Sequence, residues 1–354
     1  MKILVAMSGG VDSSVAAALL LEQGHDIAGV TLRLWGGESD SGCCSVADVD
    51  DARRVAQQLG IEHWVFNFAE DFDAKVVEPY VDAHAAGQTP NPCIECNRHI
   101  KFDRLLWRSG QLGFDALATG HHVRRVRVGS RWALARAVDT AKDQSYVVHM
   151  LDQAALARCV FPIGEMAKSI VRERAAALGL RTADKPDSQD VCFIAAKGGG
   201  RRTFLGSRIG LHPGRVIDTS GQAIGTVDAI ELVTIGQRRG LDAGGVGERR
   251  FVVDIDAVRA TITMGNASDM LMESVDLKGL VWASAPVLGP VRVQSSAHGL
   301  AVRGRIDASR VTFDEPHRRI ASGQSVVFYD DPSGQIVLGG GLATSGSRRR
   351  VIDA

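Results

Sequence analysis

The sequence lacks several features that would assign its class directly. Its 41 basic and 41 acidic residues leave a formal net charge of zero, so any binding of nucleic acid must depend on local basic patches. Six cysteines in 354 residues are too few for a disulfide scaffold, and no apolar run approaches membrane-spanning length. The first apolar run, Ile3 to Met7, is too short for a secretory signal. We therefore expect a protein of a reducing, cytoplasmic compartment, in which cysteines serve chemistry more than structure.

Two common phosphate-binding motifs are also absent from the N-terminal region. No lysine lies between Lys2 and Lys75, which excludes the Gly-Lys-Ser/Thr ending of a Walker loop, and the Gly-x-Gly-x-x-Gly dinucleotide pattern is missing as well. In their place, the run Ile3 to Met7 leads into the polar loop Ser8-Gly9-Gly10-Val11-Asp12-Ser13, and strong helix formers follow from Ser14 to Leu21. This order predicts a buried strand, a tight loop and a helix.

The predicted loop has the properties of an anion site. Gly9 and Gly10 let the backbone turn and bring bare N–H groups close to a ligand. The helix that follows presents unsatisfied N–H groups and its positive dipole end to the loop, which favours a phosphate. The alternative is that the glycines form only a turn and that Asp12 caps the helix.

Strands and helices alternate through the segment that follows. Apolar runs predict further buried strands at Ile27 to Trp35, Ile61 to Phe68 and Asp115 to Gly120. Apolar residues at helical spacing predict a helix that Gly60 ends, and another helix covers Phe72 to Ala85. Such alternation indicates an α/β fold with a doubly wound parallel sheet, in which ligands bind beyond the carboxyl ends of the strands. The loop after the first strand lies at such an end.

The pattern changes after this sheet. Val123 to Val128 and Arg131 to Ala137 predict a β-hairpin around Gly129-Ser130. Its polar face carries four arginines that either contact nucleic acid or are only solvated: Arg124, Arg125, Arg127 and Arg131. Farther on, short apolar runs between glycine turns predict mostly β modules, with one strand over Gly225 to Ile235. The predicted domains are residues 1–203, a central mostly β domain over 204–272 and a β-barrel over 273–354.

Five segments occur in a fixed order along the chain. The first, Ser8 to Ser13, resembles the pyrophosphatase loop of the N-type ATP pyrophosphatases, the PP-loop superfamily. The others are Pro90 to Asn97, Lys142 to Tyr146, Ser188 to Ile194 and Ile235 to Leu241. Together they are similar to the tRNA-specific 2-thiouridylase family, and the similarity runs over nearly the whole chain. The resemblance implies a PP-loop catalytic domain followed by the two β domains.

The same resemblance implies an enzyme that thiolates the wobble uridine in the anticodon loop of tRNA. ATP adenylylates the 2-oxygen of the uracil and pyrophosphate leaves, with Mg²⁺ offsetting the phosphate charge beside Asp12. Sulfur then comes from a cysteine persulfide that a sulfur-donor protein supplies. Cys192 is implied as the persulfide carrier and Cys96 as the nucleophile, and the two are implied to form a redox pair. No membrane takes part.

The resemblance also implies binding residues, position by position. For ATP they are Ala6, Met7, Ser8, Gly9, Gly10, Val11, Asp12, Ser13, Leu32 and Gly120. Beside the target base they are Cys93, Ile94 and Glu95. For tRNA they are His121, Lys142, Asp143, Gln144, Arg303, Gly304 and Gln324. Most family members have an aromatic residue at the position of Gly304, so a stacking contact is not carried over there.

The cysteines leave a second sulfur chemistry open. A helix predicted to resume at about Asn97 would put Cys96 at its N-terminus, where a thiol is a good nucleophile. Many family members carry aspartate at the position of Cys93, so this chain has three thiols, Cys93, Cys96 and Cys192, that could hold an iron–sulfur cluster. We favour the persulfide route. Cys159 is predicted to be structural, and the Cys43-Cys44 pair is left unassigned.

Two other functions stay open from the sequence. An ATP pyrophosphatase that acts on a small molecule would need neither Cys96 nor Cys192, nor the terminal β domains. An RNA-binding protein that retains only the nucleotide fold would tolerate the loss of Asp12.

Overall fold

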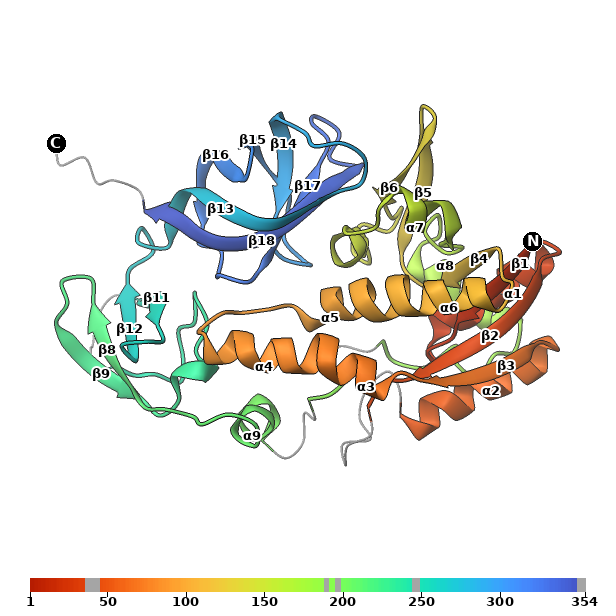
Figure 1. Ribbon diagram of the computed structural model, residues 1–354, viewed down its shortest axis with the longest axis horizontal. Coiled ribbons are helices and arrows are strands. Elements are labelled where there is room, and N and C mark those ends of the chain that lie inside the picture. Colours follow the sequence, from red (N-terminus) through yellow and green to blue (C-terminus); the bar gives the residue numbers. More distant parts are fainter. Residues whose placement is uncertain (36–44, 188–190, 195–198, 244–248, 349–354) are drawn as a thin grey trace.

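The N-terminal part of the chain folds around a parallel β-sheet (Figure 1). The computed structural model describes residues 1–35, 45–187, 191–194, 199–243 and 249–348, and its first sheet has the strand order β3-β2-β1-β4-β7. Neighbouring strands are parallel, so their carboxyl ends meet at one edge. This confirms the predicted fold class. The strands are β1 Lys2–Ala6, β2 Asp26–Arg33, β3 Glu62–Asn67, β4 Ala116–Thr119 and β7 Cys159–Val160.

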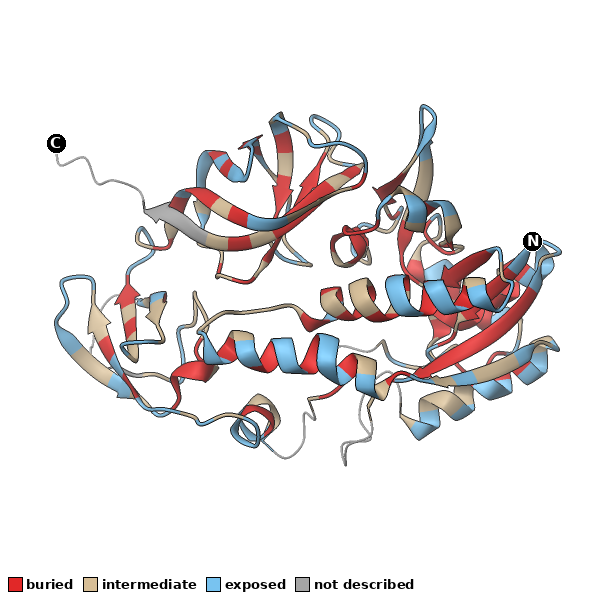
Figure 2. Ribbon diagram, in the orientation of Figure 1, coloured by how far each residue is buried: buried red, intermediate tan, exposed pale blue. Residues whose placement is uncertain are grey.

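Helices cover both faces of this sheet, as successive side chains of β1 show. Ile3 and Val5 pack into a core with α1 (Val11–Glu22), α2 (Val46–Leu59) and α8 (Lys168–Ala177). Leu4 points the opposite way and packs against helical residues between positions 72 and 106. Because both faces are covered, β1 and β2 are continuous apolar runs rather than alternating ones. Figure 2 shows these central strands buried along their length.

Two helical stretches lie side by side on the second face (Figure 1). The second stretch begins at Pro92, and Asn91 caps it by accepting hydrogen bonds from the N–H groups of Cys93 and Ile94 at 3.1 and 3.4 Å. The predicted helix start at about Asn97 is therefore wrong, because the cap and the proline at the first helical position start the helix earlier. Cys96 lies inside the helix and not at its N-terminus, so the predicted activation of its thiol by the helix start is not supported. The stretches comprise α3 Ala69–Phe72, η1 Asp73–Val77 and α4 Glu78–Ala85, then α5 Pro92–Glu95, η2 Cys96–Leu105 and α6 Leu106–Gln111.

The predicted hairpin forms from β5 (Val123–Val128) and β6 (Arg131–Arg136), but its arginines do not share one polar face. The guanidinium carbons of Arg125 and Arg127 lie 4.0 and 3.8 Å from the ring centre of Trp132. Arg124 is out of phase with them along the strand and donates to the carbonyl of Arg136 at 2.5 Å. The single basic face is therefore wrong, because side chains alternate between the two faces of a strand.

Two β modules follow, a central sheet in the order β10-β9-β8-β12-β11 and a closed barrel in the order β13-β16-β15-β14-β17-β18. The strand predicted over Gly225 to Ile235 is wrong in its second half, where β9 ends and a helical turn forms over Ile230–Leu232. A strand would place Ile230 and Val233 on opposite faces, whereas both are buried in one cluster. The central strands are β8 Gly214–Asp218, β9 Ala223–Val227, β10 Asp242–Ala243, β11 Phe251–Asp256 and β12 Thr261–Gly265. The barrel strands are β13 Leu271–Trp282, β14 Gly289–Gln294, β15 Val302–Asp307, β16 Arg310–Arg318, β17 Ser325–Tyr329 and β18 Val337–Arg348.

The barrel packs on the N-terminal domain as part of its core. Val327, Tyr329 and Val337 belong to the same buried cluster as Tyr146. The Tyr146 hydroxyl also donates to the carbonyl of Ser325 at 2.9 Å. Within the described part of the chain, no helix combines the length and the apolar character that crossing a membrane needs.

The close approach of the barrel to the first domain at Gly340 can be tested by adding one methyl group there. A Cβ added at Gly340 of β18 would lie 2.6 Å from the ring of buried His149 and 2.7 Å from the carbonyl oxygen of Val326. We expect Gly340→Ala to lower the free energy of unfolding by about 1–3 kcal/mol, because an overpacked contact must move apart. Chemical denaturation measures this, and an unchanged midpoint would show that the contact yields without cost.

Candidate active site

The loop after β1 is fixed by its own serines. The backbone N–H of Ser8 donates to the Ser13 hydroxyl at 3.1 Å, and the hydroxyls of Ser13 and Ser14 donate to the carbonyl of Gly10 at 3.1 and 2.8 Å. Helix α1 begins directly after Gly10, which has no side chain to cap the first turn. The interpretation of Asp12 as a helix cap is therefore wrong. The N–H groups of this first turn stay available to an anion.

Two glycines let other elements approach this loop closely. Gly9 has a φ of +70°, and a Cβ there would lie 2.3 Å from the backbone oxygen of Asp48 at the start of α2. A Cβ at Gly120, directly after β4, would lie 2.6 Å from the backbone nitrogen of Ser13. The ends of β1 and β4 and the start of α2 thus meet at one place, as predicted for a site beyond the strand ends.

The Asp12 carboxylate is the centre of the charges at this place. Lys168, at the start of α8, reaches both carboxylate oxygens at 2.7 Å. The Nε2 atom of His122, which lies just after β4, is 3.1 Å from Oδ1 of Asp12. Burial raises the pKa of Asp12, but the hydrogen bonds from His122 and Lys168 outweigh it and keep the pKa below its usual value. Asp12 is therefore charged at neutral pH.

A second carboxylate extends the network. Oδ1 of Asp187 lies 2.9 Å from Lys168 and 2.9 Å from Arg172, and Oδ2 lies 2.8 Å from Lys142. Burial raises the pKa of Asp187, but the hydrogen bonds from Lys142 and Lys168 bring it to about 2. Lys142, Lys168 and Arg172 thus place positive charge around these carboxylates, which suits a site for a phosphate.

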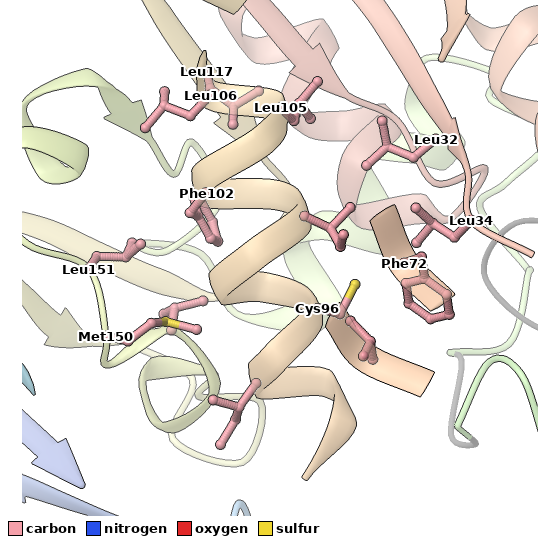
Figure 3. Packing of buried hydrophobic residues seen from close by; sticks show 14 of the residues in the cluster. Leu32, Leu34, Phe72, Cys96, Phe102, Leu105, Leu106, Leu117, Met150 and Leu151 are labelled. Atoms are coloured by element: carbon pink, nitrogen blue, oxygen red, sulfur yellow. The ribbon is translucent and has the colours of Figure 1, made fainter. Parts of the chain in front are cut away.

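The two proposed catalytic thiols approach one apolar cluster. Cys96 is 8% exposed within it, and Cys192 packs against it while partly buried. Figure 3 shows Cys96 on the side of its helix that faces Leu34 and Phe72. Phe193, next to Cys192, packs edge-on against Phe72 with ring centres 5.7 Å apart. The implied pairing of Cys96 with Cys192 stays a prediction.

Comparison with known proteins shows to which family the chain belongs. Residues 1–196 match the tRNA methyl transferase HUP domain, residues 202–266 the tRNA methyl transferase PRC-barrel domain and residues 290–343 the aminomethyltransferase β-barrel domain. A tRNA-specific 2-thiouridylase MnmA of Chloroflexus aggregans is 46% identical, with 96% of this chain and 97% of that protein covered. Proteins of the same name from Roseiflexus castenholzii and Rhodococcus jostii are 44% and 43% identical and cover 96% and 99% of this chain, and 98% and 99% of their own lengths. The chain belongs to the tRNA-specific 2-thiouridylase family.

The positions that the 2-thiouridylase resemblance assigns to the target base differ in exposure. Cys93 is exposed and Ile94 is fully buried in the core. Glu95 lies 3.4 Å from Arg98 and 3.3 Å from His99. Among the residues that the structure describes, no three His, Cys, Asp or Glu side chains are arranged to hold a metal ion. The pair Cys43-Cys44 and residues Ser188 to Asp190 lie outside the described residues.

Several positions assigned to tRNA in 2-thiouridylases are engaged inside the protein here. His121 is 8% exposed between Phe102 and Phe161, and burial holds its pKa well below the usual value. The Asp143 side chain is 5% exposed and pairs with Arg136 at 2.7 Å. Their contacts with tRNA stay predictions, and their side chains have little free surface.

Three further tRNA positions belong to the barrel, and the nucleotide position Leu32 lies in the sheet. Arg303 lies 3.8 Å from Asp331 and is mostly exposed, while Gln324 donates to the carbonyl of Thr89 at 2.8 Å. Gly304 lies in β15, where a Cβ would meet the carbonyl oxygen of Thr312 at 2.7 Å. Leu32 is buried near the end of β2.

Three members of the charged network, Lys168, His122 and Asp187, were missed by reasoning from the sequence. Lys168 begins an otherwise ordinary amphipathic helix far along the chain, and nothing in its spacing points to Asp12. His122 could have been found, because it directly follows a predicted strand end and such ends face the ligand. Asp187 lies next to the Ser188 to Ile194 motif, but no sequence pattern that includes it points to the charged network.

The depressed pKa of Asp187 predicts a pH-dependent contribution to stability. A carboxylate whose folded pKa is below the unfolded value of about 3.9 stabilises the fold fully above that pH. Its contribution is lost as the pH falls from about 4 toward the folded pKa of about 2. We expect Asp187→Asn to be less stable than the parent at pH 7, with the difference shrinking below pH 4. Urea unfolding of both proteins over this range tests it, and a constant difference would contradict the ion-pair assignment.

Proposed function

We propose that this chain is an ATP-dependent tRNA-uridine 2-sulfurtransferase. The observation that carries the proposal is the uncapped start of α1 beside the Ser8–Ser13 loop, with Asp12 held between Lys168 and His122. Membership of the 2-thiouridylase family supports the choice of tRNA as substrate.

In the first step the 2-oxygen of the wobble uracil attacks the α-phosphorus of ATP. The bond between the α-phosphorus and the bridging oxygen breaks, and pyrophosphate leaves with the negative charge. Backbone N–H groups of Gly9, Gly10 and the first turn of α1 are the donors available to the leaving phosphates. Lys168 supplies a positive charge beside them.

The charged groups at the loop also fit a magnesium ion bound together with the phosphates. Asp12 provides carboxylate oxygens, which Mg²⁺ prefers, and Asp187 offers Lys168 a second partner if one of those oxygens is taken. When bound, the ion would offset phosphate charge during cleavage. Asp12 would hold it.

In the second step sulfur replaces the activated oxygen. The terminal sulfur of a Cys192 persulfide attacks carbon 2, and AMP leaves with the oxygen. The Cys96 thiolate then attacks the Cys192 sulfur and breaks the persulfide bond, which leaves 2-thiouridine and a Cys96–Cys192 disulfide. Two thiols are oxidised while the transferred sulfur is reduced, so the electrons balance.

The ATP step predicts a specific loss. Asp12→Ala should reduce pyrophosphate release by on the order of 10²-fold or more, because one charged group at the phosphates is removed. Asp50→Ala, on the exposed face of α2, is the matched control and should release pyrophosphate normally. Circular dichroism checks the fold of both. Release of orthophosphate instead would contradict the loop interpretation, and tRNA-independent release would favour a small-molecule substrate.

The sulfur step separates the two cysteine chemistries. Under the persulfide route, Cys96→Ser and Cys192→Ser should each stop thiolation but retain pyrophosphate release, because the loop handles ATP separately. Cys93→Ala should keep thiolation in iron-free protein supplied with a persulfide donor. Cys159→Ala is the matched control, since Cys159 is fully buried and burial raises its pKa to about 12. Mass spectrometry of the wobble nucleoside measures each result.

One result would decide for the cluster alternative. Activity that appears only after anaerobic iron–sulfur reconstitution, and that disappears in Cys93→Ala, would make the three thiols cluster ligands and overturn the persulfide assignment.

A further inference from the structure

One segment contacts both partners of Asp12, Lys168 and His122, and also joins the barrel. We call residues 139–146 the bracket segment. Gln144 makes two hydrogen bonds to the backbone of His122. Its backbone N–H donates to the His122 carbonyl at 2.8 Å, and its side-chain Oε1 accepts from the His122 N–H at 2.8 Å. His122 in turn contacts Asp12. The backbone that carries this imidazole is therefore held by Gln144.

The bracket segment is also connected to Lys168, once directly and once through Asp187. The Asp139 carboxylate accepts a hydrogen bond from the backbone N–H of Lys168 at 2.9 Å. Lys142 lies 2.8 Å from Asp187, whose other oxygen lies 2.9 Å from the Lys168 ammonium. Both groups that hold Asp12 are thus tied to residues within one short stretch of chain.

Asp143, in the middle of the bracket segment, faces the barrel instead. Its Oδ1 accepts from the N–H groups of Ala137 and Ser145 at 3.0 and 3.2 Å, and its Oδ2 accepts from Arg136 and the Ser145 hydroxyl, each at 2.7 Å. Both carboxylate oxygens are therefore engaged within the protein, one by backbone N–H groups and one by side chains. The Ser145 hydroxyl also lies 2.9 Å from that of Tyr329 in the barrel.

Arg136 completes the connection to the barrel. Its Nη2 donates to Gln294 at 2.6 Å, its Nε donates to the carbonyl of Gly334 at 2.9 Å, and its guanidinium carbon lies 3.8 Å from the ring centre of Tyr329. The planar guanidinium makes these contacts and the Asp143 bond at once, which a lysine ammonium cannot do. Arg136 is only 15% exposed in this pair, so little solvent competes for its bonds.

We propose that Arg136 is a positioning residue for the nucleotide site, which it supports through Asp143 by fixing the bracket segment against the barrel. The inference rests on the ATP-binding part of the proposed function. It means that the barrel contributes to nucleotide binding although it supplies no group to the loop. Loss of Arg136 lets Lys142 and Gln144 shift, and with them Lys168 and His122, which orient Asp12.

The test measures affinity for a non-hydrolysable ATP analogue, with magnesium and without RNA, by calorimetry on the full chain. We expect Arg136→Ala to weaken binding about tenfold, as loss of an outer partner of a binding group commonly does. Arg136→Lys should bind the analogue with an affinity between those of the parent and Arg136→Ala. Gln294→Met, which keeps Arg136 and removes one of its barrel partners, should weaken binding less but in the same direction. Arg310→Ala removes a barrel arginine that lies 3.2 Å from Asp276, away from the bracket segment, and should bind like the parent.

Chemical rescue distinguishes positioning from general loss of stability. Arg136, Asp143 and Gln294 line a cleft of about 540 Å³, so a small guanidinium ion can reach the vacated position in Arg136→Ala. Added at concentrations far below those that unfold proteins, it should restore most of the affinity. Unchanged affinity in Arg136→Ala, weakening without rescue, or equal weakening in Arg310→Ala would each overturn the proposal.

If Arg136→Ala does not fold, the Gln294→Met variant alone tests the proposal. An affinity of Gln294→Met for the ATP analogue equal to that of the parent would then overturn it. Because no RNA is present, these failures leave the proposed tRNA thiolation standing. Failure of the unaltered chain to bind the nucleotide would instead count against the proposed function.

Discussion

The carboxylate of Asp12 constrains the architecture more than any other group. It stands in the first turn of α1, close to where phosphate must bind, and a bare negative charge there would repel the ligand. Lys168 and His122 offset that charge, and they come from the start of α8 and the end of β4. Three elements far apart in the sequence must therefore meet within hydrogen-bond distance. The glycines at positions 9 and 120 remove the side chains that would keep them apart.

The sequence predicted the first sheet well because its signals are local. Strand β1 is apolar on both faces, and α2 carries a capping box at Ser45 and a left-handed Gly60 at its end. The predictions failed where a tertiary contact or a cap decided the structure. Asn91 starts the helix before Cys96, and the burial of Ile230 with Val233 turns a predicted strand into a helical turn.

The candidate site was predictable only in part, for the same reason. The Ser8–Ser13 loop has a contiguous pattern, so its role as an anion site could be argued from residue types alone. The partners of Asp12 form no such pattern, since Lys168 lies 156 residues away and His122 lies 110 residues away. Asp143 was assigned to tRNA by resemblance, whereas its carboxylate is used within the protein. Motif positions therefore identify the region of a site better than the task of each side chain.

The placement of barrel residues in the core of the first domain bears on how the chain folds as it is synthesised. Ser145 and its hydroxyl partner Tyr329 are 184 residues apart. The first domain therefore emerges from the ribosome long before the barrel residues that complete its core have been synthesised. Until then the surface around Tyr146, Val148 and His149 is uncovered and apolar. Such a surface attracts chaperones or other nascent chains. The core around Tyr146 therefore closes only after the barrel has been synthesised.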